Sequence, residues 1–257
     1  FARSLTDTGT AQRDYTELGE IMAAKTGGLG ADPLLGLVRG SRKTIGYLSV
    51  AGKAVYDKLP DLFALTREIL LEPIKDADVL RERLGQMLLE AKARLEHGLQ
   101  SAGHAAVSSR LRARFNGASA LAERTTGLSY LESVRGLLDR INAEPQSILD
   151  DLEELRSRII ARPGAIFDCT AEAQGLTMVE AEARQLLRAL APVRAGSESG
   201  FGSAPLELPH GEAFIAPAQI NYVGKAANIY DQGYVYHGSA SVILRYLRMG
   251  YLWERVR

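Results

Sequence analysis

The chain has 257 residues with 31 basic and 31 acidic side chains, so its formal net charge at neutral pH is zero. A balanced charge argues against nucleic acid or an anionic membrane as the main partner, because both attract strongly basic surfaces. The lone cysteine, Cys169, excludes a disulfide framework within the chain, and no apolar run approaches the roughly 18–20 residues that cross a bilayer.

Helical patterns dominate the sequence. Apolar residues recur at helical spacing in several stretches that are bounded by Gly, Pro or capping residues. The predicted helices span residues 1–24 with a break at 8–10, 60–72, 76–115 with weak points at Gly98 and Gly103, 118–125, 129–141, 145–161 and 177–190. Asp14 or Thr16 is a candidate N-cap within the first stretch, and Thr177 to Glu180 resembles a capping box.

Four stretches favour strands because β-forming residues are dense in them. They span residues 34–38, 44–52, 165–170 and 213–226. We expect residues 165–170 to form a buried strand. A final helix, with Ser239 or Ser241 as its N-cap, follows to the end of the chain. Because helices and strands are partly segregated, the sequence predicts the α+β class.

The two ends of the last predicted segment differ in character. Residues 192–209 are rich in Gly, Ser, Ala and Pro, which is typical of a linker. The chain then ends at Arg257 inside a predicted helix, with neither a cap nor a polar tail. A natural domain seldom ends within a helix, so we expect the chain to be a piece of a longer protein.

Several unusual strings follow one another in an order that resembles a known family. They are Thr26-Gly27-Gly28-Leu29, Glu68-Ile69-Leu70-Leu71-Glu72-Pro73, Ser101-Ala102-Gly103-His104, residues 217–230 (PAQINYVGKAANIY) and residues 237–257 (HGSASVILRYLRMGYLWERVR). Together they resemble the peptidase-associated region of presequence proteases, which belong to the insulinase–pitrilysin zinc metallopeptidases.

This resemblance implies a domain organisation. Enzymes of the group are built from four related α+β units, each a sheet covered by helices. Residues 1–200 would form the third unit without its leading strands, and residues 201–210 a linker. Residues 211–257 would supply the first strand and helix of the fourth unit.

The histidines do not match the zinc motif of the group. That motif is His-x-x-Glu-His on a helix, with a distant Glu as third ligand. The histidines here are His97, His104, His210 and His237, and no two of them have that spacing. We therefore predict no metal ligand and no bound cofactor in this chain, whereas the resemblance implies zinc in the full-length parent protein.

Two short comparisons concern individual residues. Gly9-Thr10 resembles the end of the family's metal-binding helix, which would place Arg3 and Ser4 where Glu and His are required. The resemblance also implies one catalytic residue, Arg257, whose guanidinium would hold the substrate carbonyl and the developing oxyanion at a distant zinc site. The alternatives are that Arg255 has this role or that Arg257 is a plain surface residue.

Other readings of the sequence are weaker. The glycine-rich stretch of residues 26–30 is read as a turn, because it lacks the Lys-Ser/Thr ending of a phosphate-binding loop. No Gly-x-Ser-x-Gly elbow is present. The aromatic residues after residue 221 either pack a sheet against a helix or line a peptide chamber.

Three hypotheses about function remain. In the first, the chain is part of the non-metal half of a zinc endopeptidase that degrades unfolded peptides in an enclosed chamber. Its partners would be those peptides and the remaining halves of the parent chain, with neither nucleic acid nor membrane, in a bacterial cytoplasm or an organelle matrix. In the second, the parent is a non-catalytic assembly or peptide-binding relative, and in the third the chain is an independent helical interaction domain.

Overall fold

The structure, a computed structural model, describes residues 1–41, 43–193, 204–217 and 219–256. The chain divides into a large N-terminal unit, Phe1–Val223, and a small C-terminal unit, Gly224–Arg257. Each unit is described by itself. The predicted linker at residues 201–210 lies partly outside the described residues, and the predicted boundaries between family units stay predictions.

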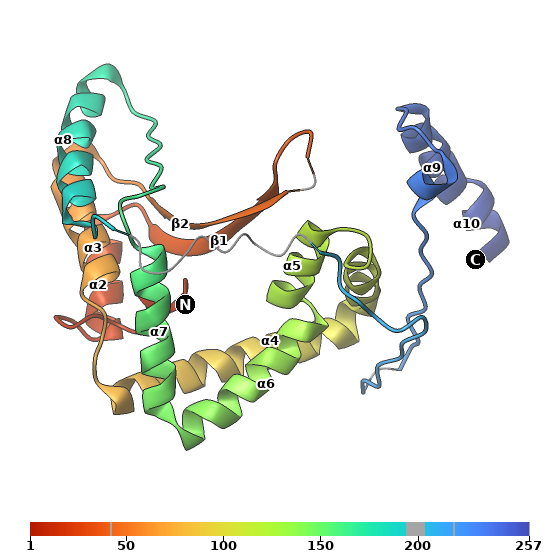
Figure 1. Cartoon of the computed structure of the whole chain (residues 1–257), viewed down its shortest axis with the longest axis horizontal. Helices are drawn as coiled ribbons and strands as arrows, with labels where there is room; N and C mark the ends of the chain where they lie inside the picture. The colour runs from red at the N-terminus through yellow and green to blue at the C-terminus, as the bar shows by residue number, and fades with distance from the viewer. Residues whose placement is uncertain (42, 194–203, 218, 257) are drawn as a thin grey trace. The chain divides into compact units, whose positions relative to one another are not determined.

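The N-terminal unit combines one hairpin with many helices (Figure 1). Its elements are α1 (Ser4–Asp7), α2 (Tyr15–Lys25), β1 (Leu29–Leu37), β2 (Thr44–Gly52), η1 (Tyr56–Lys58), α3 (Leu59–Leu71), α4 (Ala77–Arg112), α5 (Gly117–Thr126), α6 (Leu128–Ala143), α7 (Pro145–Ile159) and α8 (Ala173–Ala189). The predicted α+β class is therefore confirmed, with a two-stranded antiparallel sheet among the described residues.

The hairpin is longer than its predicted first strand. β1 pairs with β2 from Leu29 opposite Gly52 to Leu37 opposite Thr44. The ladder continues past the strands, because the amide of Gly27 donates to the carbonyl of Lys53 at 2.7 Å. This pairing draws part of the predicted glycine-rich turn into the strand.

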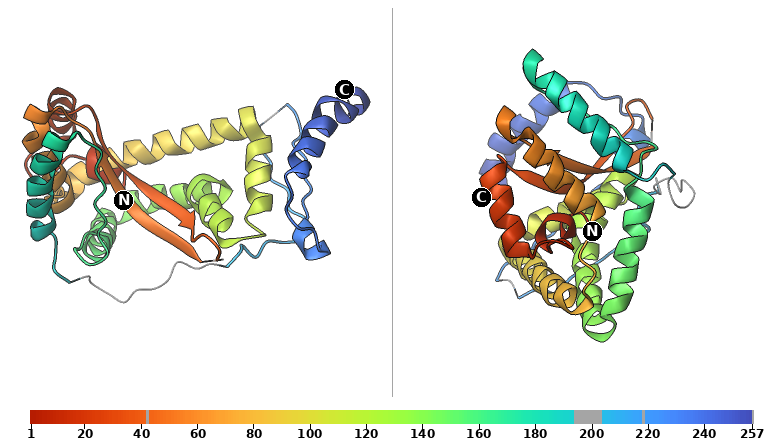
Figure 2. Two further views of the ribbon diagram at one scale, coloured as in Figure 1. Left: turned by 90° about the horizontal axis from the view of Figure 1, so that it is seen from above. Right: turned by 90° about the vertical axis from the view of Figure 1, so that its left-hand side faces the viewer.

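Three apolar clusters of the described residues hold the N-terminal unit together. The first joins α1, α2, β1 and α3, and the second joins α3 to α8, which lies beside it in Figures 1 and 2. The third joins α4 to α6 and α7. Their buried members are Leu5, Leu18, Ala31, Leu65, Ile69, Leu70, Ile160 and Leu190 in the first, Leu59, Phe63, Val179 and Ala183 in the second, and Leu80, Leu84, Ile141 and Ile148 in the third.

Helix α4 is kinked at the place where the sequence predicts a weak point. Ala102 has non-helical dihedral angles, φ −141° and ψ 40°, next to Gly103. The ring of Tyr222 lies against Gly103, and a Cβ added there would be 2.3 Å from the Tyr222 Cδ2 atom. Glycine at this position thus leaves the space that the aromatic ring occupies.

Side-chain caps are confirmed at one predicted helix start and wrong at another. The Asp14 carboxylate accepts hydrogen bonds from the amides of Thr16 and Glu17, as expected for an N-cap. The predicted capping box at Thr177 is wrong, because α8 already begins at Ala173 with no side-chain cap. Gly175, Val179 and Ala183 form a buried face of α8 that starts before Thr177, so packing extends the helix toward its N-terminus.

Both later predicted strands are wrong. Residues 165–170 and the described part of residues 213–226 form no ladder. In the first stretch Ile166 is 75% exposed, and the ring of Phe167 stacks on that of Phe63 with centroids 6.0 Å apart. A strand requires a neighbouring strand to receive its backbone hydrogen bonds, and no described segment takes that place beside either stretch.

The C-terminal unit consists of η2 (Ile229–Gln232), α9 (Ser239–Met249) and α10 (Tyr251–Val256). The predicted serine caps are wrong, since Gly238 is the N-cap of α9 and no side chain caps it. The Ser239 amide instead donates to the Nδ1 atom of His237 at 3.2 Å. Among the described helices of both units, none combines the length and apolar character needed to span a membrane.

The first testable prediction concerns Ile69, which is 1% exposed in the first cluster. We expect Ile69→Ala to lower the free energy of unfolding by about 2–5 kcal/mol, because the truncation leaves a cavity in a packed core. Leu89→Ala, at an exposed position of α4, is the matched control and should stay within about 0.5 kcal/mol of the unaltered chain. Urea titration measures both, and equal losses in the two variants would contradict the assigned core.

Candidate functional site

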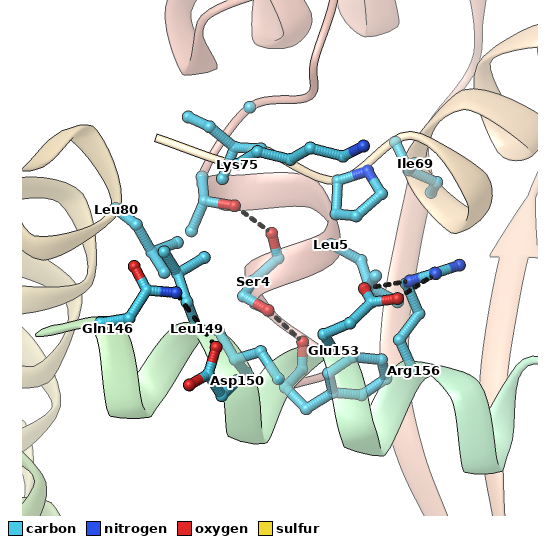
Figure 3. Close-up of a pocket in the computed structure, with 16 residues that line it drawn as sticks. Ser4, Leu5, Ile69, Lys75, Leu80, Gln146, Leu149, Asp150, Glu153 and Arg156 are labelled. Carbon is cyan, nitrogen blue, oxygen red and sulfur yellow. Dashed lines mark hydrogen bonds and ion pairs between the residues drawn. The ribbon is translucent and has the colours of Figure 1, made fainter. Parts of the chain in front are cut away.

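A cavity of about 360 Å³ lies between α1, the connection from α3 to α4, and α7 (Figure 3). Apolar side chains and polar side chains both contribute to its lining. The apolar ones are Phe1, Leu5, Ile69, Pro73, Ile74, Leu80, Leu149 and Leu152, and the polar or charged ones are Ser4, Thr8, Lys75, Gln146, Asp150, Glu153 and Arg156.

Several polar groups of this cavity are already engaged. The Ser4 hydroxyl donates to the carbonyl of Phe1 at 2.7 Å, and the Thr8 hydroxyl donates to the carbonyl of Ser4 at 2.6 Å. Gln146 donates to Asp150 at 3.0 Å. Glu153 pairs with Arg156, whose hydrogen bond lowers the pKa of that carboxyl group. Neither His nor Cys is among the described residues that line the cavity, so its geometry favours binding over nucleophilic or metal chemistry.

The Gly9-Thr10 stretch beside the cavity is a tight turn attached to α3. Gly9 has φ +90°, a conformation that favours glycine. The Thr10 hydroxyl donates to the buried carboxylate of Glu68 at 2.6 Å, and the Arg13 guanidinium pairs with the other oxygen. The carboxylate of Glu68 is therefore compensated by a charge and a hydrogen bond, which anchors the turn.

The residues compared with the family's metal helix lie apart from any metal group. Arg3 is exposed as the N-cap of α1, and Ser4 is buried beside it. Within the described part of the chain, no group of three or more His, Cys, Asp and Glu side chains is placed to hold a metal ion. The ring of His104 lies 6.1 Å from that of Tyr222, between centroids, and His237 contacts Ser239.

The predicted catalytic residue, Arg257, lies outside the described residues, so its role stays a prediction. Its alternative, Arg255, is exposed on α10 with its guanidinium carbon 5.9 Å from the Tyr251 ring centroid. The aromatic residues of this region divide into two groups. Tyr222 packs on α4, whereas the rings of Tyr230, Tyr236, Tyr246, Tyr251 and Trp253 are exposed.

Sequence reasoning missed an ion network at the C-terminal end of α4. The Arg110 guanidinium binds both oxygens of Glu212, at 2.9 and 2.8 Å, and also donates to Glu123 at 3.0 Å and to Ser129 at 2.8 Å. Glu123 is 0% exposed, and its second oxygen has no hydrogen-bond partner among the described residues.

The network also shifts the titration of its members. The hydrogen bond from Arg110 is the main reason that the pKa of Glu212 is lowered, and the same bond raises the pKa of Arg110. The acids lie 13 and 102 positions from Arg110, so no short motif could have revealed the group.

Comparison with known proteins places this helix-rich α+β chain in a class. Residues 1–137 match the family model for the associated domain of peptidases in metallopeptidase family sixteen, subfamily C, and residues 211–257 match the "PreP C-terminal domain". The chain belongs to this family of peptidase-associated domains. It is thus a peptidase-associated segment, as the sequence resemblance predicted.

Individual relatives agree with this assignment. The chain is 35% identical over 258 residues to presequence protease 1, chloroplastic/mitochondrial, of Arabidopsis thaliana, covering 100% of this chain and 23% of that protein. It is 24% identical over 256 residues to Protein HypA of Clostridium perfringens, covering 97% of this chain and 25% of that protein. The chain therefore spans no more than 25% of the length of these curated relatives.

The anchored turn leads to a second prediction. Gly9→Ala should lower the free energy of unfolding by at least about 1–2 kcal/mol, because an L side chain is strained at positive φ. The new Cβ would also lie 2.7 Å from the carbonyl oxygen of Arg13. Gly85→Ala is the matched control, since α4 leaves open space there and alanine favours a helix by up to about 1 kcal/mol. Thermal melts that shift equally for both variants would contradict this account.

Proposed function

We propose that this chain is part of the non-metal half of a zinc endopeptidase similar to presequence proteases, and that it forms wall in a chamber that encloses unfolded peptides. The observation that carries the proposal is the 35% identity to a presequence protease along the whole chain. The two family matches, which follow each other in chain order, support it further.

The proposal includes a larger architecture around the N-terminal unit. Residues 1–200 would be the third insulinase-type unit, whose further strands come from elsewhere in the parent protein. Exposed apolar side chains support this, namely Leu34 and Tyr47 on the hairpin and Ile166 in the extended stretch. Large apolar side chains left in water favour a covering partner, and a two-stranded sheet is marginally stable unless it packs against more structure.

The C-terminal unit offers a similar argument. Val242, Tyr246 and Met249 recur at helical spacing on α9 and are exposed, as is Trp253 on α10. An apolar stripe of this kind is typical of a helix that packs against a core. Residues 211–257 would therefore be the start of a fourth unit, and the remaining halves of the parent chain would cover the stripe.

Zinc chemistry would belong to another part of the parent protein. The described residues offer no group of side chains that fits zinc, and this chain would bind no cofactor. Arg257 would instead reach the distant site, where its charged fork would hold the carbonyl oxygen of a peptide bond as negative charge develops. The peptide itself would add as a strand to a sheet edge beside the metal.

A second candidate function is a non-catalytic assembly or peptide-binding protein with the same fold. The 24% identity to Protein HypA, whose name states no peptidase activity, keeps this candidate in view. A His-x-x-Glu-His motif in the upstream part of the parent protein would decide for the peptidase. The third hypothesis, an independent helical interaction domain, is disfavoured by the exposed apolar side chains of the hairpin and α9.

Our third prediction is that the isolated chain does not hydrolyse peptide bonds. An unfolded peptide incubated with the chain and zinc should stay intact in mass spectra, because the His-x-x-Glu-His motif is absent from the sequence. The parent protein under the same conditions is the control. Reproducible cleavage by the isolated chain, abolished by a chelator, would contradict the proposal.

The fourth prediction tests Arg257 in the parent protein. Arg257→Ala should lower kcat for an unfolded peptide by about 10²–10³-fold, the usual cost of losing one donor to an oxyanion. Arg255→Ala, two positions away, is the matched control and should retain near-normal kcat. Equal rates in the two variants would refute the assignment of Arg257 while leaving the chamber-wall proposal standing.

A further inference from the structure

An extended segment of the N-terminal unit, Leu206–Phe214, lies along the end of α4 without helix or strand structure of its own. We name this segment the strap. Its backbone makes specific contacts with the residues that follow α4. The Leu206 amide donates to the carbonyl of Ala113 at 2.9 Å, and the Arg114 guanidinium donates to the carbonyls of Pro209 and Leu208 at 2.7 and 3.0 Å.

The charged contact of the strap is the pair between Glu212 and Arg110. The guanidinium is 15% exposed and the carboxylate 21% exposed, so water competes only partly for this two-pronged contact. The ring of Phe214 lies over the same guanidinium, with its centroid 5.6 Å from the Cζ atom. Paired hydrogen bonds between Arg and a carboxylate are among the strongest polar contacts in proteins.

Arg110 is held in place independently of the strap. Glu123 of α5 and Ser129 of α6 both accept hydrogen bonds from it, so its fork is oriented before Glu212 binds. If the strap leaves, the buried charge of Glu123 keeps its partner. Separation of the strap therefore does not expose an uncompensated buried charge, which distinguishes it from unfolding of the helices.

We propose that Arg110 is a latch with two positions, in which the strap is either docked on α4 through Glu212 or released while the helices stay folded. The strap immediately precedes the segment that carries Tyr222 and the C-terminal unit. Docking thus ties the chain to α4 shortly before that unit begins, and release leaves the end of α8 as the preceding attachment. Segments with few contacts open at the lowest free-energy cost.

The charges around the latch make docking dependent on pH. Arg110 and Arg114 of the α4 end face Glu212, and Glu123 of α5 faces Arg110. The hydrogen bond from Arg110, and then the nearby positive charges, lower the pKa of Glu212 from its ordinary value of 4.5. Because the folded-state pKa is depressed, the contact contributes fully above pH 4.5 and is lost as the pH falls through the lowered value.

The fifth prediction follows, and it does not depend on the proposed peptidase role. Hydrogen exchange of the 257-residue chain near neutral pH should show about tenfold faster exchange of the strap amides in Glu212→Gln, because a charge-assisted contact is lost. Glu207→Gln, an exposed position of the same strap, is the matched control and should exchange as the unaltered chain does.

A second pair of variants tests the helix side of the latch. Arg110→Lys keeps a charge near Glu123 but lacks the fork, so it should also speed exchange in the strap. Arg112→Lys on the same helix should not, because Arg112 donates to the carbonyl of Ser108 instead. Unchanged strap exchange in Glu212→Gln would overturn the proposal, and so would faster exchange spread evenly over α4 to α7.

A pH series completes the experiment. Strap protection, corrected for intrinsic exchange rates, should fall below pH 4.5 in the unaltered chain and stay flat in Glu212→Gln. The same loss of protection in both proteins would mean that another group controls the strap, and it would overturn the proposal.

Discussion

The burial of α3 is the constraint on which the N-terminal unit depends. Leu65 and Ile69 belong to the cluster shared with α1, α2 and β1, while Phe63 belongs to the cluster shared with α8. Glu68 on the same helix holds the turn that contains Thr10 through a buried hydrogen bond. Because α3 takes part in all three of these contacts, the hairpin, the N-terminal turn and α8 take their positions from it.

The helices after α3 use a different means of attachment. α4, α6 and α7 share an apolar cluster, but the far end of α4 is joined to α5 and the strap by Arg110. A charge at that place costs desolvation and in return specifies one partner geometry. This arrangement gives a rigid helical surface, suited to the wall of a chamber, with one separable segment that leads to the C-terminal unit.

Local signals in the sequence predicted the elements whose stabilising contacts are close along the chain. Helical spacing located α3 to α7, the Asp14 cap marked the start of α2, and Gly103 marked the kink of α4. Local signals failed where a distant partner decides the outcome. Residues 165–170 have strand-forming side chains without a described neighbouring strand, and α8 begins before Thr177 because its buried face extends that far.

The amino-acid order alone established the family, the α+β class and the mismatch between the histidines and a zinc motif, since each depends on residue identity and short spacing. The folded chain decided the partners of Glu68, the ring against Gly103, and the meeting of Arg110 with two acids that lie 13 and 102 positions away. Buried charges and close packing arise from residues that only the tertiary fold brings together, so no local pattern records them.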